Sequence, residues 1–286
     1  MLTINPEQNV AKIVIKKFQE YRDILLKNKK SLLDIGQYTN FIFRGQSNPY
    51  WPLASSYYRL YHKYKSAGIQ CPSENQMINA FKRRCPDNFK FVFNSKHKNM
   101  DLEILALMQL HGACTRLLDF TYDPYAALYF AARDMNMNPY NPGIFHFAVF
   151  AINKKIIRRK IPKLCFDLKK HEEVADKNIY LLNTYPLHSF EPSEEITNTV
   201  LRSKQQKPVF IYTGNPLTNM NNRFINEHNW YRLRGNKPAL IKNEIWLDLY
   251  TYKDLMNQLN IGSCNEALLF PDEDGFCRSL NSFIIT

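Results

Sequence analysis

The sequence predicts an α+β fold in which a helix-rich N-terminal half packs against a mixed β core. Segments with helical spacing and capping signals are concentrated before residue 133, whereas apolar, β-like runs are concentrated after residue 143. The composition, with 45% hydrophobic and 14% aromatic residues in a chain of 286, is that of a globular protein with a sizeable core. We expect a single domain over residues 1–286, with residues 1–37 as an N-terminal helical extension and residues 38–280 as its core.

A helix and a strand are the first elements expected. Residues 6–30 place apolar residues such as Val10 and Ile13 at helical spacing between Lys and Glu, which predicts an amphipathic helix. Residues 41–43 have strand character, and Arg44-Gly45-Gln46 is expected to end that strand in a turn. An Arg beside a Gly at a strand end can bind a phosphate or carboxylate in a bidentate manner. A structural ion pair, for example to an acid near the C-terminus, is the alternative role for Arg44.

Two helices are expected next. Residues 73–93 begin with Ser73 and Gln76, a pattern typical of a capped helix start. Residues 100–111 are predicted to form a second helix that ends near Gly112, because glycine commonly follows the last helical turn.

The segment of residues 109–132, QLHGACTRLLDFTYDPYAALYFAA, carries the strongest candidates for chemistry. Asp119 and Thr121 predict a polar bend, because these residues are too polar for a core strand. Asp123 and Pro124 then predict the start of a helix whose alanines pack closely against a sheet. Free backbone N–H groups at a helix start favour a bound anion. Alternatively, Asp119 and Thr121 only satisfy the turn, and Arg116 pairs with Asp119.

The rest of the chain supplies most of the expected strands. Residues 143–152 are predicted to lie in the sheet centre, and residues 153–207 to form short helices and loops with a mobile polar tract over residues 188–199. The remaining expected elements are strands at residues 209–213, 238–241, 244–250 and 267–270, and helices at residues 252–259 and 272–280.

Several classes of protein are disfavoured by what the sequence lacks. The six cysteines contain no CxxC pair and the seven histidines show no metal-binding spacing, so we predict reduced thiols and no structural metal. No apolar run approaches the roughly 20 residues of a membrane span, and the start has no signal-peptide pattern. We therefore expect a soluble, cytoplasmic protein with no membrane partner.

The net charge of +12 is unevenly distributed. Basic residues cluster between Lys82 and Lys98 and again between Lys154 and Lys170, whereas residues 243–286 carry seven acids and two bases. Such clusters make nucleic acid a plausible partner. Solvated helix surfaces, or contacts with an acidic protein, are the alternatives.

Three motifs in order resemble the FRG-domain family. Phe43-Arg44-Gly45-Gln46 resembles its name-giving motif, residues 109–132 resemble its central motif, and residues 269–275 resemble its terminal Leu-Phe-Pro-Asp-x-Asp-Gly. The resemblance spans residues 38–280. The chain departs from the pattern at residues 110–111 and 113–114, and Arg223 is followed by Glu227-His228 where the family has Gln-Gln, so a site role for these three is left open.

The order of motifs is also similar to that of ADP-ribosyltransferases of the Arg, Ser-Thr-Ser, Glu type. That resemblance implies a split sheet, NAD as co-substrate, and a Glu at the start of a late strand, for which Glu266 is the candidate. It implies that a carboxylate stabilises the oxocarbenium-like state formed when the nicotinamide bond breaks. The expected catalytic residues are Glu266, Asp119 and Thr121. The residues expected to bind NAD are Arg44, Gly45, Gln46, Thr115, Arg116 and Tyr125, with Tyr57 or Tyr58 as other stacking partners.

The leading functional hypothesis is an NAD-dependent ADP-ribosyltransferase of the toxin or phage-defence kind. Its expected acceptor is nucleic acid, RNA rather than DNA, and a neutralising antitoxin protein is implied by the class. The alternatives are a non-catalytic nucleic-acid-binding module and a metal-dependent nuclease with Asp119, Glu266, Asp272 and Asp274 as ligands.

Overall fold

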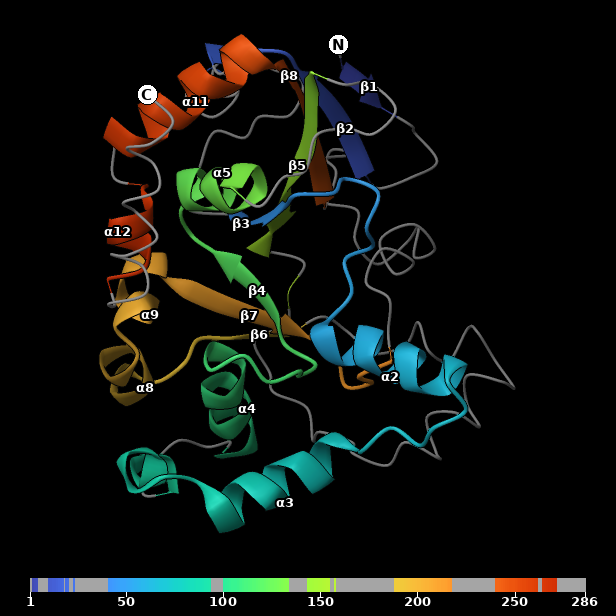
Figure 1. Cartoon of the computed structure of the whole chain (residues 1–286), viewed down its shortest axis with the longest axis vertical. Coiled ribbons are helices and arrows are strands. Elements are labelled where there is room, and N and C mark those ends of the chain that lie inside the picture. Colours follow the sequence, from blue (N-terminus) through green and yellow to red (C-terminus); the bar gives the residue numbers. More distant parts are fainter. Residues whose placement is uncertain are drawn as a thin grey trace.

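A computed structural model describes residues 2–4, 10–17, 19–20, 23, 41–93, 100–133, 143–154, 157, 188–217, 240–261 and 264–271. Within these residues the fold is α+β, as the sequence predicts (Figure 1). Strands from both ends of the chain join one sheet. Helix α11 lies beside β8 and α5 at one end of the molecule, whereas α3 and α4 lie at the opposite end.

Eight strands form the sheet, in the order β1-β2-β8-β5-β3-β4-β7-β6. The six strands from β8 to β6 pair antiparallel, β2 pairs parallel to β8, and β1 closes that edge antiparallel to β2. Strand β5 lies inside the sheet between β8 and β3, which confirms the position predicted for residues 143–152. The strands are β1 (Leu2–Ile4), β2 (Val10–Ile15), β3 (Phe41–Gln46), β4 (Leu118–Thr121), β5 (Ile144–Asn153), β6 (His188–Phe190), β7 (Pro208–Tyr212) and β8 (Leu240–Asp248).

The helices cover the sheet and the end of the molecule beyond β7. Helix α3 begins with the predicted capping box, in which Ser73 and Gln76 exchange side-chain to backbone hydrogen bonds. Helix α4 is followed by Gly112, whose φ of +88° confirms the predicted helix end. The helices are α2 (Ser56–Ser66), α3 (Glu74–Arg84), the 3₁₀ helix η2 (Asp87–Phe93), α4 (Met100–Leu110), α5 (Pro124–Arg133), α8 (Glu194–Thr199), α9 (Leu201–Gln206), α11 (Leu249–Ile261) and α12 (Glu266–Leu269).

Helix α5 follows the prediction closely. The Asp123 Oδ1 accepts hydrogen bonds from the backbone N–H groups of Tyr125 and Ala126, so Asp123 caps the helix. The alanine face packs on β3 at Gly45, where a Cβ would lie 2.0 Å from the Ala127 oxygen and 2.6 Å from the Ala131 nitrogen. Only glycine permits this approach of helix and strand.

Several predictions of secondary structure differ from the structure in whole or in part. Residues 10–15, expected in a helix, form β2, and their β-branched residues favour a strand beside β8. Residues 267–270, expected in a strand, lie in or directly after α12, which Asn265 caps by accepting from the Leu268 N–H. Strand structure is confirmed over residues 240–241 and 244–248, but the two strands expected at 238–241 and 244–250 form the single strand β8, and residues 249–250 begin α11. The polar tract 188–199, expected to be mobile, contains β6 and α8.

The expected bend at Asp119 and Thr121 is also wrong, because these residues lie in β4. Leu118 and Phe120 point into the core while Asp119 is exposed, so polar and apolar residues alternate as in a strand with one solvated face. By contrast, Arg44, Gly45 and Gln46 are the last three residues of β3, and the turn follows directly at residues 47–50, so the predicted end of this strand is confirmed.

Among the described residues, no helix is long and apolar enough to cross a membrane. The described cysteines, Cys71, Cys85, Cys114 and Cys264, form no disulfide.

Candidate functional site

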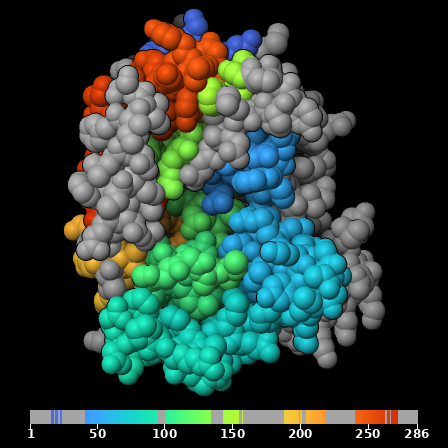
Figure 2. All heavy atoms as spheres, viewed as in Figure 1, coloured from blue at the N-terminus to red at the C-terminus, as the bar shows by residue number. Residues whose placement is uncertain are grey.

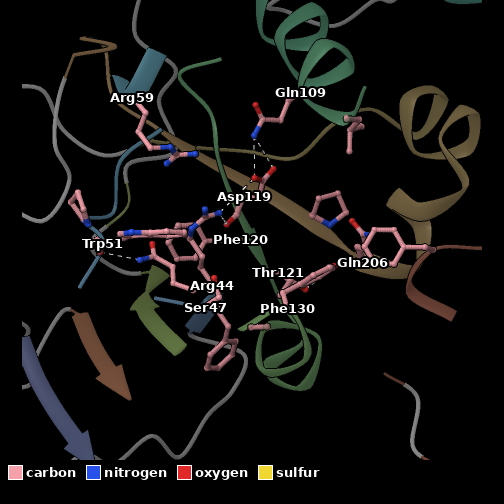
Figure 3. Close-up of a pocket in the computed structure, with 18 residues that line it drawn as sticks. Arg44, Ser47, Trp51, Arg59, Gln109, Asp119, Phe120, Thr121, Phe130 and Gln206 are labelled. Carbon is pink, nitrogen blue, oxygen red and sulfur yellow. Dashed lines mark hydrogen bonds and ion pairs between the residues drawn. The ribbon is translucent and has the colours of Figure 1, made fainter. Parts of the chain in front are cut away.

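A cavity of about 820 Å³ lies where β3 and β4 separate. These neighbouring strands share a single register pair, Phe43 with Thr121, whereas β4 and β7 share four. The end of α4, helix α5 and the junction of α9 with β7 complete the walls. In the space-filling view this face is hollowed near its middle, where blue and green atoms of the segments around β3 and α5 meet (Figure 2). The polar and aromatic side chains that define its chemistry are Arg44, Arg59, Gln109, Asp119, Trp51 and Phe130 (Figure 3).

Arg44 reaches from β3 across to β4. Its Nη1 donates a 2.8 Å hydrogen bond to the Asp119 backbone oxygen and lies 3.6 Å from the Asp119 Oδ2. Its Nε is buried and has no hydrogen-bond partner within the described part of the chain. Burial lowers the pKa of Arg44, Arg59 acts in the same direction, and Asp119 opposes them. A guanidinium remains protonated at neutral pH in spite of such effects, so Arg44 keeps a buried, under-used donor beside the cavity.

Asp119 presents its carboxylate to the cavity, with half of the side chain exposed. The Gln109 Nε2 at the end of α4 donates to both carboxylate oxygens, at 3.2 and 3.0 Å. The other end of this amide, Oε1, accepts a 2.7 Å hydrogen bond from the Thr115 hydroxyl. Thr115 therefore lies behind the site and contributes through Gln109.

The opposite wall comes from the segment after β3 and from α2. Gln46 is buried and donates a 3.0 Å hydrogen bond to the Trp51 backbone oxygen, which ties this segment to β3. Trp51 lines the cavity with 57% of its surface exposed. Arg59 donates to the Ala54 oxygen at 2.6 Å, and in Figure 3 its guanidinium converges with that of Arg44 toward Asp119. The described lining thus has two guanidinium groups against one carboxylate, which favours an anionic ligand.

Thr121 and Gly45 line the cavity but have structural contacts. The Thr121 hydroxyl donates to the Gln206 backbone oxygen at 2.7 Å and accepts from the Asp123 N–H. Gln206 in turn donates to the Leu269 oxygen at 2.8 Å, which joins α9 to α12. Gly45 permits the close packing of α5 described above, so it shapes the cavity without offering a side chain.

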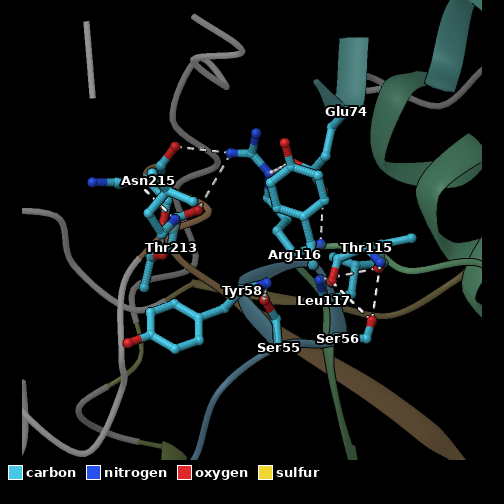
Figure 4. A network of polar contacts seen from close by, with 12 residues as sticks. Ser55, Ser56, Tyr58, Glu74, Thr115, Arg116, Leu117, Thr213 and Asn215 are labelled. Atoms are coloured by element: carbon cyan, nitrogen blue, oxygen red, sulfur yellow. Dashed lines mark hydrogen bonds and ion pairs between the residues drawn. The ribbon is translucent and has the colours of Figure 1, made fainter. Parts of the chain in front are cut away.

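Arg116, Tyr125 and Tyr57, predicted to bind NAD, do not line this cavity. Arg116 is fully buried, and its Nε lies 2.6 Å from the Glu74 Oε2 while its Nη1 donates to the Gly214 oxygen at 2.8 Å (Figure 4). The predicted alternative, an Arg116–Asp119 pair, is wrong, because Arg116 pairs with Glu74 and Asp119 contacts Arg44. Tyr125, in the first turn of α5, packs against the core, and the fully buried Tyr57 donates its hydroxyl hydrogen to the Pro72 oxygen. Tyr58 tilts against His62 on α2.

Several other predicted residues lie at or beyond the limit of the described chain. Glu266 opens α12, and Phe270, directly after that helix, lines the cavity, but the Glu266 side chain lies outside the described part. Arg223, Glu227, His228, Asp272 and Asp274 lie wholly outside it, as do the helix expected at 272–280 and most of the second basic cluster. Within the described residues, no group of three or more His, Cys, Asp or Glu side chains could hold a metal ion.

The first basic cluster is partly neutralised where the structure describes it. Lys82 pairs with Asp101 at 3.0 Å and Lys90 with Asp87 at 2.6 Å. Exposed pairs of this kind reduce the net positive potential of the cluster. Arg83 and Arg84 remain exposed beside them.

Sequence reasoning gave no role to Gln109, Arg59 or Trp51. Gln109 lay within the central motif, but its contact with Asp119 depends on how α4 packs against β4. Arg59 and Trp51 belong to a stretch for which no element was predicted, and α2 forms there. The capping residue Ser55, which accepts from the Tyr58 N–H, was the available signal for that helix.

Comparison with known proteins gives a family match over part of the chain. No curated protein and no solved structure matches the chain. The family match is shorter than the resemblance expected over residues 38–280, and it includes β3, α2, α4, β4 and α5, which carry Arg44, Arg59, Gln109 and Asp119. Residues 39–139 of this chain match the FRG domain.

Proposed function

We propose that this protein is an NAD-dependent ADP-ribosyltransferase whose active site is the cavity between β3 and β4. The observation that supports this most is the Asp119 carboxylate, which is half exposed to the cavity and oriented by Gln109, while Arg44 lies beside it and Arg59 lines the same cavity. The positive charge of the two arginines suits the diphosphate of NAD, and the carboxylate suits the ribose, which becomes positively charged as the nicotinamide bond breaks. Pockets for ligands of this size measure about 300–1,000 Å³, which includes the observed cavity.

Each lining group has a role in this proposal. Arg44 and Arg59 bind the pyrophosphate, for which the buried Arg44 Nε supplies an available donor. Trp51 and Phe130 provide aromatic surfaces for the rings. Asp119 stabilises the positive charge on the ribose as the bond from C1′ to the nicotinamide nitrogen breaks. The bonding electrons leave with neutral nicotinamide, and the acceptor forms the new bond to C1′ and loses its proton.

Glu266 stays a candidate for a second catalytic group. The Phe270 side chain lines the cavity directly after α12, so the helix that Glu266 opens ends beside the site. The finer fold proposal, an ADP-ribosyltransferase-like split sheet, is supported by the single register pair between β3 and β4. A strand at Glu266, which the class would have, is replaced by α12.

The acceptor proposed is nucleic acid, with RNA favoured over DNA. This rests on the net charge of +12, since basic surfaces bind the phosphate backbone. An activity of this kind would harm its own cell, and we propose a toxin or phage-defence role with a neutralising antitoxin protein.

The test is nicotinamide release and label transfer. The purified protein is incubated with NAD labelled in the adenylate part and with separate RNA, DNA and protein pools, beside the Asp119→Asn, Arg44→Lys and Glu266→Gln variants. We expect Asp119→Asn to lower the rate of nicotinamide release by about 100-fold or more while NAD binding persists. Arg44→Lys should weaken NAD binding, because a lysine cannot donate in the same fork geometry.

A matched control is Asp87→Asn, which removes an exposed carboxylate from a surface pair that does not line the cavity. It should retain the wild-type rate. If the folded protein neither binds NAD nor releases nicotinamide, the proposal is wrong. The second candidate, a non-catalytic nucleic-acid-binding module, then predicts RNA binding that weakens steeply with salt and is reduced by Arg83→Gln and Arg84→Gln.

A further inference from the structure

We infer that Gln109 is a positioning residue that holds the Asp119 carboxylate away from Arg44, so that both groups remain available to the ligand. This inference rests on the proposed function. Gln109 occupies the last turn of α4, and its amide lies between Thr115 and Asp119. The Gln109 amide does not titrate, so Gln109 contributes by fixing the position of the Asp119 carboxylate.

The orientation of the Gln109 amide is determined by its two neighbours. An ionised carboxylate only accepts hydrogen bonds, so the NH₂ end must face Asp119. The oxygen end then faces the Thr115 hydroxyl at 2.7 Å. A flipped amide would place Oε1 against the carboxylate oxygens, where two acceptors repel. Both contacts therefore favour one orientation.

Thr115 is itself fixed from the other side. It is fully buried, its N–H donates to the Ser56 Oγ at 3.0 Å, and the Ser56 hydroxyl donates to the Thr115 oxygen at 3.2 Å. The Leu117 N–H donates to the Thr115 Oγ1 at 3.2 Å, which leaves the hydroxyl hydrogen directed at Gln109. A chain of hydrogen bonds thus runs from α2 through Thr115 and Gln109 to β4.

The consequence appears in the contact between Asp119 and Arg44. The Arg44 Nη1 donates to the Asp119 backbone oxygen, while the Asp119 Oδ2 lies 3.6 Å away, beyond hydrogen-bond distance. Without Gln109, the carboxylate could rotate and form a bidentate pair with the guanidinium. That pair would neutralise Arg44 toward a diphosphate and turn the carboxylate away from the sugar.

Kinetics of nicotinamide release from NAD test this inference with single and double variants. Gln109→Ala should lower kcat by about 100-fold, as a displaced catalytic group does, and should also raise KM. In the Asp119→Asn background, adding Gln109→Ala should change kcat less than twofold, because Gln109 acts through Asp119. Thr115→Ser, which keeps the hydroxyl, should retain a rate near that of the wild type, whereas Thr115→Val should lose at least tenfold. A double variant whose losses multiply would overturn the inference.

An independent readout separates failure of this inference from failure of the proposed function. Selective ¹⁵N labelling of glutamine allows the Gln109 side-chain NH₂ signals to be followed in the folded protein without NAD. Asp119→Asn and Thr115→Val should each shift these signals, whereas Asp87→Asn should not. If the wild type releases no nicotinamide but the signals shift, the proposed function fails and the hydrogen-bond chain stands. If neither Asp119→Asn nor Thr115→Val shifts them, the inference is wrong whatever the activity.

Discussion

Replacement of Gly45 by alanine tests how the cavity is built. The added Cβ would lie 2.0 Å from the Ala127 oxygen and 2.6 Å from the Ala131 nitrogen, and both are backbone atoms of α5. Carbon atoms normally pack at about 3.5–4.0 Å, so the helix must retreat by more than about 1 Å. Because β3 and α5 form a buried part of the core, we expect Gly45→Ala to lower the free energy of unfolding by at least about 3 kcal/mol.

Urea denaturation measures this loss, and Gly68→Ala is the matched control. Gly68 has a φ of +69° with no atom within 4 Å of an added Cβ, so its substitution costs only the left-handed backbone conformation, about 1–2 kcal/mol. The folded Gly45→Ala variant, measured without urea, should also bind NAD more weakly, because Phe130 moves with α5. A Gly45→Ala variant as stable as Gly68→Ala would refute the steric reasoning.

Two further predictions concern buried groups away from the cavity. Arg116→Met and Glu74→Gln should each lower the free energy of unfolding, measured by urea denaturation, by about 3–5 kcal/mol, because each leaves a buried charged partner uncompensated. The double variant should lose clearly less than the sum of the two single losses. Additive losses would contradict a direct coupling between Arg116 and Glu74. Burial, with a smaller contribution from Asp123, raises the pKa of the Cys264 thiol to about 12. In the unfolded chain the thiol ionises at about pH 8.5. The buried neutral thiol therefore makes its full contribution to the free energy of unfolding below that pH, and this contribution is lost as the pH rises toward 12, by up to about 1.4 kcal/mol per pH unit. Between pH 8.5 and 10, Cys264→Ala should therefore show a flatter decline of the unfolding free energy than the wild type, and parallel curves would contradict this.

Local signals were sufficient where one segment determines its own structure. The capping box of α3, the Asp123 cap of α5 and the apolar run of β5 were all predicted, because each depends on neighbours within a few residues. The alanine face of α5 and its close approach to a sheet were also predicted, although the partner strand was not. Of these elements, α5 lines the cavity through Ala127 and Phe130.

Strand β2 and the ion-pair partners could not be predicted from the sequence, because both depend on pairing between distant segments. Residues 10–15 have apolar spacing compatible with a helix, and they form a strand because β8, more than 200 residues away, offers a parallel partner. Arg44 and Asp119 are 75 residues apart, and Arg116 and Glu74 are 42 apart, so the choice of ion-pair partner depended on the sheet order. Asp119 was expected in a bend, and its position in a strand was missed because its alternation with Leu118 and Phe120 spans only a four-residue strand.

The tripeptide Arg44-Gly45-Gln46 contributes to several walls of the cavity at once. Because side chains alternate along β3, Arg44 and Gln46 lie on one face and the bare Gly45 faces α5 on the other. Arg44 extends across to β4 at the point where the two strands have only one register pair, and its contact with the Asp119 backbone bridges the separation. Gln46 holds the Trp51 segment that forms the opposite wall. A substitution at any of the three therefore alters a different wall of the same cavity.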